Sequence, residues 1–120
     1  MAKEDPAMKL VMEYEEKNGR NPKDVSNRRD TGCDIQCDDR LIEVKRRDVK
    51  YGFLFLTENE VQTFLKKPNA CLYLVYYRDG HPKLRIFDRE TVIRNLCMAT
   101  VRYRFGLTKS SKENTKEIDL

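Results

Sequence analysis

The chain has 120 residues and a mass of 14.2 kDa, which fits one compact domain and leaves little room for a second. Charged residues make up 37% of the sequence and hydrophobic residues 39%, so we expect a small core beneath a heavily charged surface. The net charge of +4 permits binding to a polyanion, and no apolar run approaches the roughly 20 residues of a membrane span, so nucleic acid is favoured over membrane as a partner.

The N-terminal stretch and the cysteines favour an intracellular protein, cytoplasmic or nucleoid-associated. The opening MAKEDPAMKL is too polar for a secretory signal. The four cysteines, at positions 33, 37, 71 and 97, form no CxxC pair and lie mostly in apolar stretches. We therefore expect reduced thiols in the core and no zinc site.

The first half of the chain predicts one helix followed by three short strands. Residues 6–18 have apolar side chains at helical spacing, with Asp5 as N-cap, Pro6 in the first turn and Gly19 as the stop. Residues 23–29, 31–37 and 40–46 read as strands, and the turn-forming residues Asp38 and Asp39 separate the last two. This order predicts a meander.

The second half predicts a helix, a hairpin and a third helix. In residues 57–67, Thr57 and Glu60 form a capping box ahead of an apolar face. Residues 70–77 are nearly continuously apolar, as in a strand covered on both faces, and residues 81–88 follow as its hairpin partner. Helical spacing predicts the third helix within 89–105. We expect one domain over residues 1–106 and a disordered tail over 107–120.

The register of the hairpin at Asp38 and Asp39 sorts the charges onto one face. A two-residue loop places Ile35 opposite Ile42 and Asp34 opposite Glu43. Because side chains alternate along a strand, Asp34 and Glu43 then share their face with Lys45, away from the apolar set.

Two carboxylates at that spacing repel each other and need a cation. Lys45 supplies one positive charge, and a hard divalent ion with oxygen ligands, Mg²⁺ or Mn²⁺, would supply two more. The alternative is that Asp34 and Glu43 are solvated residues on the exposed face of a hairpin, with Lys45 as a cross-strand partner.

These residues carry a resemblance to a known family. Asp34, followed by the triplet Glu43-Val44-Lys45 in IEVK, resembles the signature of the PD-(D/E)XK nuclease superfamily. More narrowly, the succession of VMEYEE, NGR, GCDI, IEVK and LTENE is similar to the DUF3883 family, also called the NO VEIN C-terminal domain. The likeness spans about residues 7 to 90.

The resemblance implies a restriction-endonuclease-like α/β (α+β) core, with a mixed central sheet flanked by helices in the order αβββαβ. It also implies a magnesium or manganese site made by Asp34, Glu43 and the carbonyl of Val44, with Lys45 positioning or deprotonating the attacking water. Such enzymes often add a glutamate from the first helix. Glu15 is the candidate because it follows Val11 by four residues, at the border of the inward face, whereas Glu13 and Glu16 point farther away.

Further candidates lie near this site. Arg46, Arg47 and Lys50 follow it along the chain and could approach a phosphate backbone, or they could be a solvated strand end. Thr57 and Glu60 belong to the family likeness, yet helix capping explains both.

The predicted function is therefore a metal-dependent nuclease domain that hydrolyses phosphodiester bonds, with DNA as the expected substrate. A homodimer and a larger helicase or ATPase, as partner or parent chain, are further expectations. The alternative is an inactive module that binds nucleic acid or serves as a scaffold within such a machine, keeping the fold without turnover.

Overall fold

A computed structural model describes residues 5–28, 32–48, 52–98, 103–113 and 115–120. No helix in these ranges has the length and apolar character needed to cross a membrane. The elements follow the chain in this order: α1 (Pro6–Lys17), β1 (Pro22–Asp24), β2 (Ile35–Cys37), β3 (Arg40–Arg47), β4 (Gly52–Leu56), α2 (Glu58–Lys66), β5 (Ala70–Arg78), β6 (His81–Asp88), α3 (Arg89–Arg94), β7 (Leu96–Met98), β8 (Tyr103–Leu107), the 3₁₀ helix η1 (Ser110–Lys112) and β9 (Glu117–Asp119).

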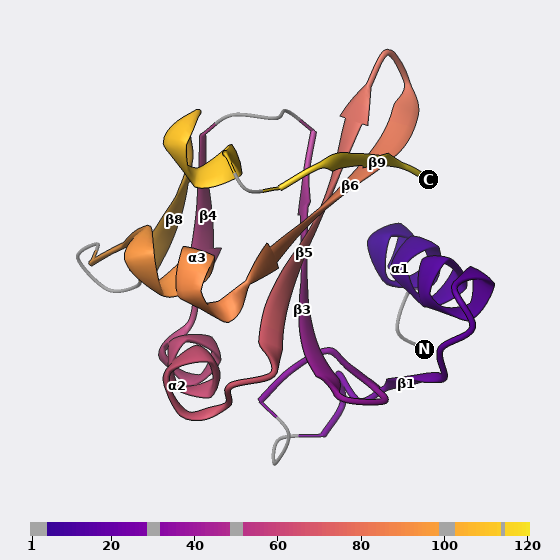
Figure 1. Cartoon of the computed structure of the whole chain (residues 1–120), viewed down its shortest axis with the longest axis horizontal. Coiled ribbons are helices and arrows are strands. Elements are labelled where there is room, and N and C mark those ends of the chain that lie inside the picture. Colours follow the sequence, from indigo (N-terminus) through magenta and orange to yellow (C-terminus); the bar gives the residue numbers. More distant parts are fainter. Residues whose placement is uncertain (1–4, 29–31, 49–51, 99–102, 114) are drawn as a thin grey trace.

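A six-stranded mixed sheet forms the centre of the molecule. Its strand order is β1-β2-β3-β5-β6-β9, and a separate sheet has the order β4-β8-β7. Strands β3 and β5 are parallel, and the other neighbours in the main sheet are antiparallel. Helix α1 covers one face of the main sheet, while α2, α3 and the second sheet lie on the other (Figure 1). The predicted order αβββαβ is confirmed for the main sheet, and β4 is an addition outside it.

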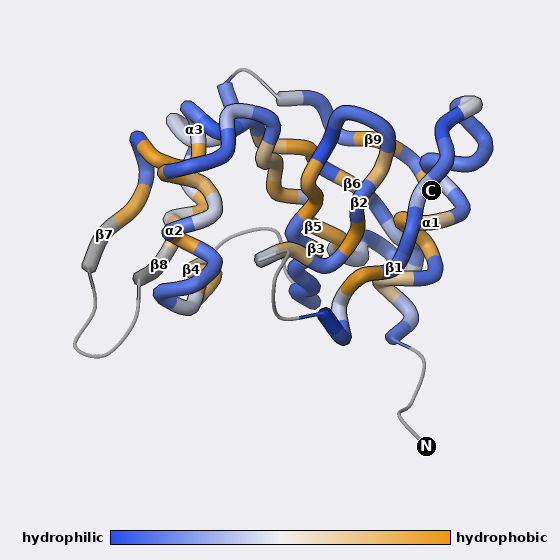
Figure 2. The backbone as a smooth tube through the Cα atoms, turned by 90° about the horizontal axis from the view of Figure 1, so that it is seen from below, coloured by the Kyte–Doolittle hydropathy of each residue, from blue (hydrophilic) through white to orange (hydrophobic). Residues whose placement is uncertain are grey.

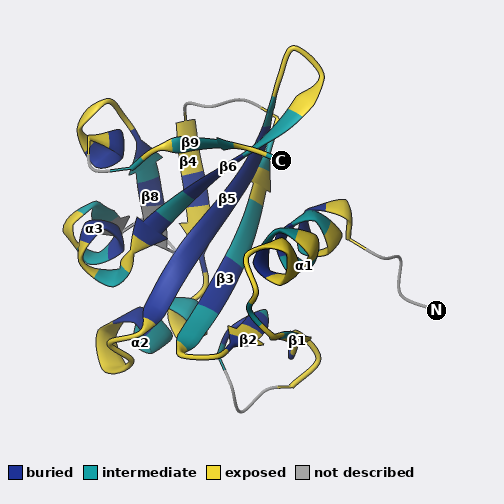
Figure 3. Cartoon of the chain, turned by 45° about the vertical axis from the view of Figure 1, so that its right-hand side comes forward, coloured by how far each residue is buried: buried dark blue, intermediate teal, exposed yellow. Residues whose placement is uncertain are grey.

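Strand β5 separates two hydrophobic clusters. Residues 70–76 are all buried, as the apolar run predicted, and β5 is dark blue along most of its length in Figure 3. Tyr73 and Val75 face α1 in one cluster, whereas Leu72 and Leu74 face α2, α3 and the second sheet in the other. Figure 2 shows the hydrophobic segments gathered along β5 and its neighbours. The two faces of the sheet at β3 and β5 therefore pack against different elements, α1 on one side and α2, α3 and the second sheet on the other.

The helix ends follow the capping chemistry of the sequence. The side chain of Asp5 accepts a hydrogen bond from the Ala7 amide at 2.9 Å, and α1 ends before Gly19, whose φ of +77° suits glycine. The capping box of α2 is also present, with Thr57 and Glu60 bonded reciprocally. These ends fix where α1 and α2 begin relative to the strands.

The predicted third helix is wrong beyond its first turns. Helix α3 ends at Arg94, and the side-chain amide of Asn95 donates to the Thr91 carbonyl at 2.8 Å. The chain then forms the hairpin β7–β8, which pairs with β4, a strand that the sequence pattern did not predict. This small sheet buries Leu54, Phe105 and other apolar side chains against β5. Burial of alternate side chains outweighed the helical spacing.

The predicted disordered tail is also wrong for the residues described. Strand β9 pairs with β6 and completes the main sheet, with Leu84 opposite Ile118. The Tyr76 hydroxyl donates to the Glu117 carboxylate, and Ile118 and Leu120 pack against the cluster under α1. The end of the chain therefore contributes to the core.

Removal of residues 116–120 should lower the free energy of unfolding by about 2 kcal/mol, because two partly buried apolar side chains and a partly buried hydrogen-bond acceptor, Glu117, are lost. Urea denaturation followed by circular dichroism measures this change, with Lys116→Ala in the full chain as the control. A truncated chain with the wild-type midpoint would contradict a structural role for β9.

Candidate functional site

The hairpin β2–β3 places Asp34 at the start of the site. The predicted register is confirmed, with Cys37 opposite Arg40 and Ile35 opposite Ile42. The ladder ends there, because the amide of Val44 donates to Oδ2 of Asp34 at 2.9 Å while the Asp34 amide donates to the Ile42 carbonyl at 3.0 Å. Main-chain bonds thus hold the Asp34 carboxylate against β3.

Strand β3 directs Glu43 and Lys45 toward helix α2. Ile42 belongs to the cluster beneath α1, so the alternation of side chains turns Glu43 and Lys45 to the opposite face. Glu43 is buried, with 5% of its surface exposed. The ammonium group of Lys45 lies 3.8 Å from Oε1 of Glu43. The three residues predicted from the signature are therefore brought together around β3.

Helix α2 adds a third carboxylate, that of Glu60. Its Oε1 accepts hydrogen bonds from the Thr57 amide at 2.8 Å and from Nζ of Lys45 at 2.9 Å. The capping box therefore has a second role, since it aims Glu60 at the charged face of β3. The sequence pattern assigned Glu60 to capping alone, although its place in the LTENE segment of the family likeness was a signal for the site.

Burial and neighbouring carboxyl groups shift the pKa values of the glutamates at this site. Burial, a hydrogen bond with Glu60, and the charges of Glu60 and Asp34 raise the pKa of Glu43 far above its usual range. Burial opposes ionisation of Glu60 too, but its hydrogen bonds with Glu43 and Lys45 lower its pKa. The raised pKa favours the neutral form of Glu43 at neutral pH.

These carboxyl groups line a pocket of about 430 Å³ between β3 and the start of α2. The opposite wall comes from Ser26 and Arg28, which follow β1, and from Gly32 and Cys33. Within the described ranges, no group of three or more His, Cys, Asp or Glu side chains is arranged as a ready metal site. The pocket instead contains three carboxyl groups, those of Asp34, Glu43 and Glu60, with room for a ligand, and Lys45 forms an ion pair with Glu60 beside them.

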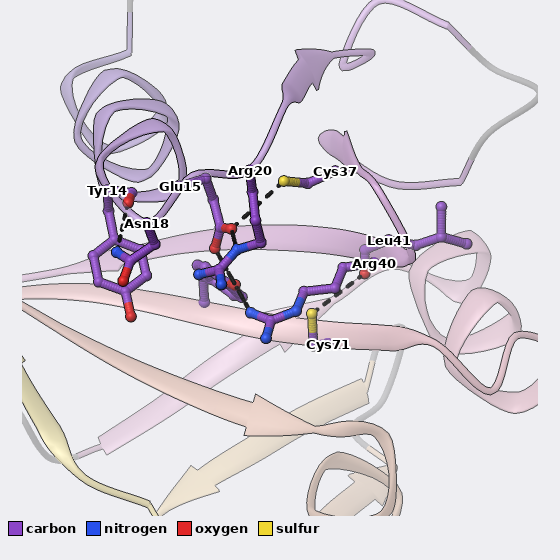
Figure 4. Close-up of polar contacts among 9 residues, drawn as sticks. Tyr14, Glu15, Asn18, Arg20, Cys37, Arg40, Leu41 and Cys71 are labelled. Carbon is purple, nitrogen blue, oxygen red and sulfur yellow. Dashed lines mark hydrogen bonds and ion pairs between the residues drawn. The ribbon is translucent and has the colours of Figure 1, made fainter.

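Glu15 does not join this pocket, so the structure contradicts the prediction that it belongs to the site. Its side chain is fully buried on the α1 side of the sheet, where it bonds the guanidinium of Arg20, the hydroxyl of Tyr73 and the thiol of Cys37 (Figure 4). Glu43 and Lys45 lie on the other face of β3. The spacing from Val11 predicted the burial of Glu15 correctly but not the face of the sheet on which its side chain lies.

The predicted nucleic-acid contacts separate onto different faces of the end of β3. Arg46 is exposed, and its guanidinium lies 5.7 Å from the ring centroid of Tyr77. Arg47 points to the side of Lys45 and donates to the Phe53 carbonyl at 2.7 Å, which ties β3 to β4. Lys50 lies outside the described residues. Of Arg46 and Arg47, the latter therefore shares a face of the sheet with the pocket.

Comparisons with known proteins agree with this arrangement. A family model described as "Protein NO VEIN, C-terminal" matches residues 3–87. The fold is similar to that of Hjc, a Holliday junction resolvase from the archaeal hyperthermophile Archaeoglobus fulgidus, with a TM-score of 0.59 and 21% sequence identity over 93% of this chain and 88% of that chain. A search of curated proteins found no match. The structural likeness confirms the predicted restriction-endonuclease-like fold.

Proposed function

Because the chain belongs to the NO VEIN C-terminal family and has a nuclease-like fold, we propose that it is a metal-dependent nuclease that cleaves phosphodiester bonds in DNA. The observation that carries this proposal is the pocket lined by Asp34 and the buried Glu43, with the ammonium group of Lys45 3.8 Å from Glu43. A DNA substrate agrees with the net charge of +4 and with the intracellular location expected from the sequence.

The donor set of the pocket fits Mg²⁺ or Mn²⁺. Asp34 and Glu43 offer carboxylate oxygens, the ligands that hard divalent ions prefer, and the Val44 carbonyl is the main-chain oxygen between Glu43 and Lys45. The raised pKa of Glu43 reflects its burial first and then the neighbouring carboxyl groups of Glu60 and Asp34. When bound, such an ion would polarise the scissile phosphate and acidify a water molecule.

The side chains have separable tasks in this proposal. Asp34 and Glu43 would hold the ion, and the hydrogen bond from the Val44 amide keeps Asp34 in place before binding. Lys45 would donate to the phosphate oxygens, where negative charge develops in the transition state. Glu60 would act as a positioning residue, since its ion pair holds the ammonium group of Lys45 close to Glu43.

Asp34→Asn should abolish both metal binding and DNA cleavage. Calorimetric titration with Mg²⁺ and Mn²⁺, run beside nicking of a supercoiled plasmid and cleavage of a four-way junction, tests both. Asp79→Asn is the matched control, because Asp79 is exposed at the tip of the β5–β6 turn. Cleavage retained in Asp34→Asn, or absent from the wild type with either ion, would overturn the proposal.

Lys45→Gln should slow cleavage about 100- to 1000-fold while metal binding persists, because a donor to the transition state is lost but no metal ligand is. Single-turnover cleavage with saturating enzyme isolates this effect from DNA affinity. Lys66→Gln, at the exposed end of α2, controls for the loss of one positive charge. An unchanged rate in Lys45→Gln would remove this residue from the chemistry.

One contact favours the alternative of an inactive nucleic-acid-binding or scaffolding module. The ion pair of Lys45 with Glu60 partly satisfies the charges of the site without a metal. Such a module would bind DNA in a salt-dependent manner without cleaving it, whether or not Asp34 is changed. A homodimer and a helicase or ATPase partner remain predictions of the sequence.

A further inference from the structure

A second pocket, of about 440 Å³, lies on the α1 side of the main sheet. It is bounded by the end of α1, the β2–β3 turn, the start of β5 and the junction of β6 with α3. Cys71 and Ile86 in its wall belong to the α1-facing cluster, whereas Glu43 and Lys45 project from the opposite face of the sheet. The proposed nuclease does not use this pocket.

Glu15 holds two guanidinium groups at the wall of this pocket. Arg20 donates to Oε2 of Glu15, and Nη1 of Arg40 lies 3.8 Å from Oε1 (Figure 4). The hydroxyl of Tyr73 donates to the same carboxylate, and burial together with this bond raises its pKa, so Tyr73 is neutral. Two cations thus face one buried anion, which leaves this cluster with a net charge of +1.

Main-chain and side-chain bonds fix Arg40 in advance of ligand binding. It follows the tight turn at Asp38 and Asp39, and the Asn69 side-chain amide donates to the Asp39 carbonyl at 2.8 Å. The Arg40 guanidinium also donates to the Tyr73 hydroxyl at 2.7 Å. The Arg40 side chain is still 36% exposed and that of Arg20 is 24% exposed, so both can reach a ligand. Such preorganisation lowers the entropic cost of binding.

The rest of the lining suits an organic group next to an anion. The Tyr14 ring lies beneath Arg20, 6.0 Å from its guanidinium carbon, and Ala70 and Ile86 add apolar wall. Of the two acidic residues in the lining, Asp88 is occupied as the N-cap of α3 and Asp39 is exposed at the turn. The volume falls within the usual range for small-molecule sites.

We propose that this pocket binds the phosphomonoester group of a nucleotide, with Arg20 and Arg40 contacting the phosphate and the Tyr14 side supporting the base or sugar. Two guanidinium groups favour a phosphomonoester, which carries close to two negative charges at neutral pH, over a single carboxylate. The group can come from a free mononucleotide or from the 5′ end of a nucleic-acid strand.

Calorimetric titration with adenosine monophosphate, without divalent metal and at low salt, tests the site. We expect the wild type to bind it, and Arg40→Gln to bind it at least about tenfold more weakly, the equivalent of one charge-assisted hydrogen bond. Arg94→Gln, at the exposed end of α3, should bind like the wild type. Arg40→Lys keeps the positive charge and should bind with intermediate affinity. This variant tests the site even if Arg40→Gln disturbs the turn.

Two further ligands separate the sources of the phosphate. A short oligonucleotide with a 5′ phosphate that binds more tightly than its 5′-hydroxyl form, with the difference lost in Arg40→Gln, identifies a strand end. If Arg40→Gln weakens binding of adenosine monophosphate but the two oligonucleotides bind with equal affinity, the ligand is a free nucleotide. Absence of wild-type binding at millimolar concentrations, equal affinity for adenosine, or full affinity in both Arg40 variants would overturn the proposal.

Discussion

Replacing Glu43 with glutamine is expected to abolish DNA cleavage and, at neutral pH, to make the metal-free chain more stable. In the folded state Glu43 is buried beside Asp34 and Glu60, which raises its pKa, whereas in the unfolded chain it is ionised at pH 7. Folding at neutral pH must therefore take up a proton or bury a charge, and either costs free energy. A neutral glutamine avoids this cost and keeps the shape of the side chain.

The gain in unfolding free energy at pH 7 should be at least about 1 kcal/mol. Cleavage should fall by at least about 1000-fold, because the variant lacks a charged metal ligand. Added Mg²⁺ should raise the melting temperature of the wild type and leave that of Glu43→Gln unchanged, since in the proposed site only the wild type would bind the ion in its folded state.

Thermal unfolding with and without Mg²⁺, together with plasmid nicking, measures both parts of this prediction. Glu58→Gln provides a matched control, because Glu58 is exposed in the first turn of α2, two residues from Glu60. A destabilised Glu43→Gln chain would show that the carboxylate of Glu43 supports the fold. A chain that is stabilised and still cleaves DNA would remove Glu43 from the reaction.

The parts of the fold that were predictable are those in which local chemistry and burial agree. The turn at Asp38 and Asp39 fixed the register of β2 with β3, and a one-residue slip would have buried Asp34 among apolar side chains. The turn at Asp79 and Gly80, both with positive φ, likewise set the β5–β6 hairpin. Because register decides which side chains share a face, the amino-acid pattern was enough to bring Asp34, Glu43 and Lys45 together.

The failures occurred where long-range packing decided the outcome. In residues 89–105 the apolar spacing fitted a helix, but Phe105 and Leu107 are buried where β8 pairs with β4. Glu60 is a second example. Helix capping, a local interaction, explained this residue fully in the sequence, so its long-range contact with Lys45 was not predicted.

Glu15 illustrates why the spacing of a side chain on a helix does not identify its function. Ala7, Val11 and Glu15 form the buried stripe of α1, so the inward direction of Glu15 was predictable. The face of the sheet that this stripe covers depends on how α1 crosses the strands, which no local pattern encodes. The carboxylate therefore lies on the side of Arg20 and Tyr73 and not on the side of Lys45.

Glu15→Gln should consequently act on stability rather than on chemistry. Its carboxylate is fully buried and accepts hydrogen bonds from Arg20 and Tyr73, so the variant leaves two donors and a guanidinium charge without their counter-charge. Loss of one partner from a buried ion pair costs about 3 kcal/mol or more. Cleavage by the fraction that remains folded should match the wild type, whereas a catalytic glutamate would lose activity without loss of stability.

The pH dependence of this effect gives a second test. Burial opposes ionisation of Glu15, but its hydrogen bonds with Arg20 and Tyr73 outweigh burial and lower its pKa below the usual 4.5. A lowered folded-state pKa stabilises the protein above the unfolded-state pKa, and the contribution disappears as the pH falls through the folded-state value. The stability difference between wild type and Glu15→Gln should therefore be constant from about pH 5 to 7 and shrink as the pH falls below about 4.5.

Urea denaturation of both chains across this pH range measures the difference, with Glu16→Gln as the control because Glu16 is the exposed neighbour on α1. The control should follow the wild type at every pH. If Glu15→Gln had the unfolding free energy of the wild type at pH 7, the buried ion pair would contribute nothing net to stability. The two arginines would then be held at their pocket by other contacts, namely the hydrogen bond of Arg40 with Tyr73 and the packing of Arg20 on Tyr14. A gap that stayed constant down to about pH 3 would instead assign the effect to side-chain shape, because protonation of the wild-type carboxylate would then change nothing.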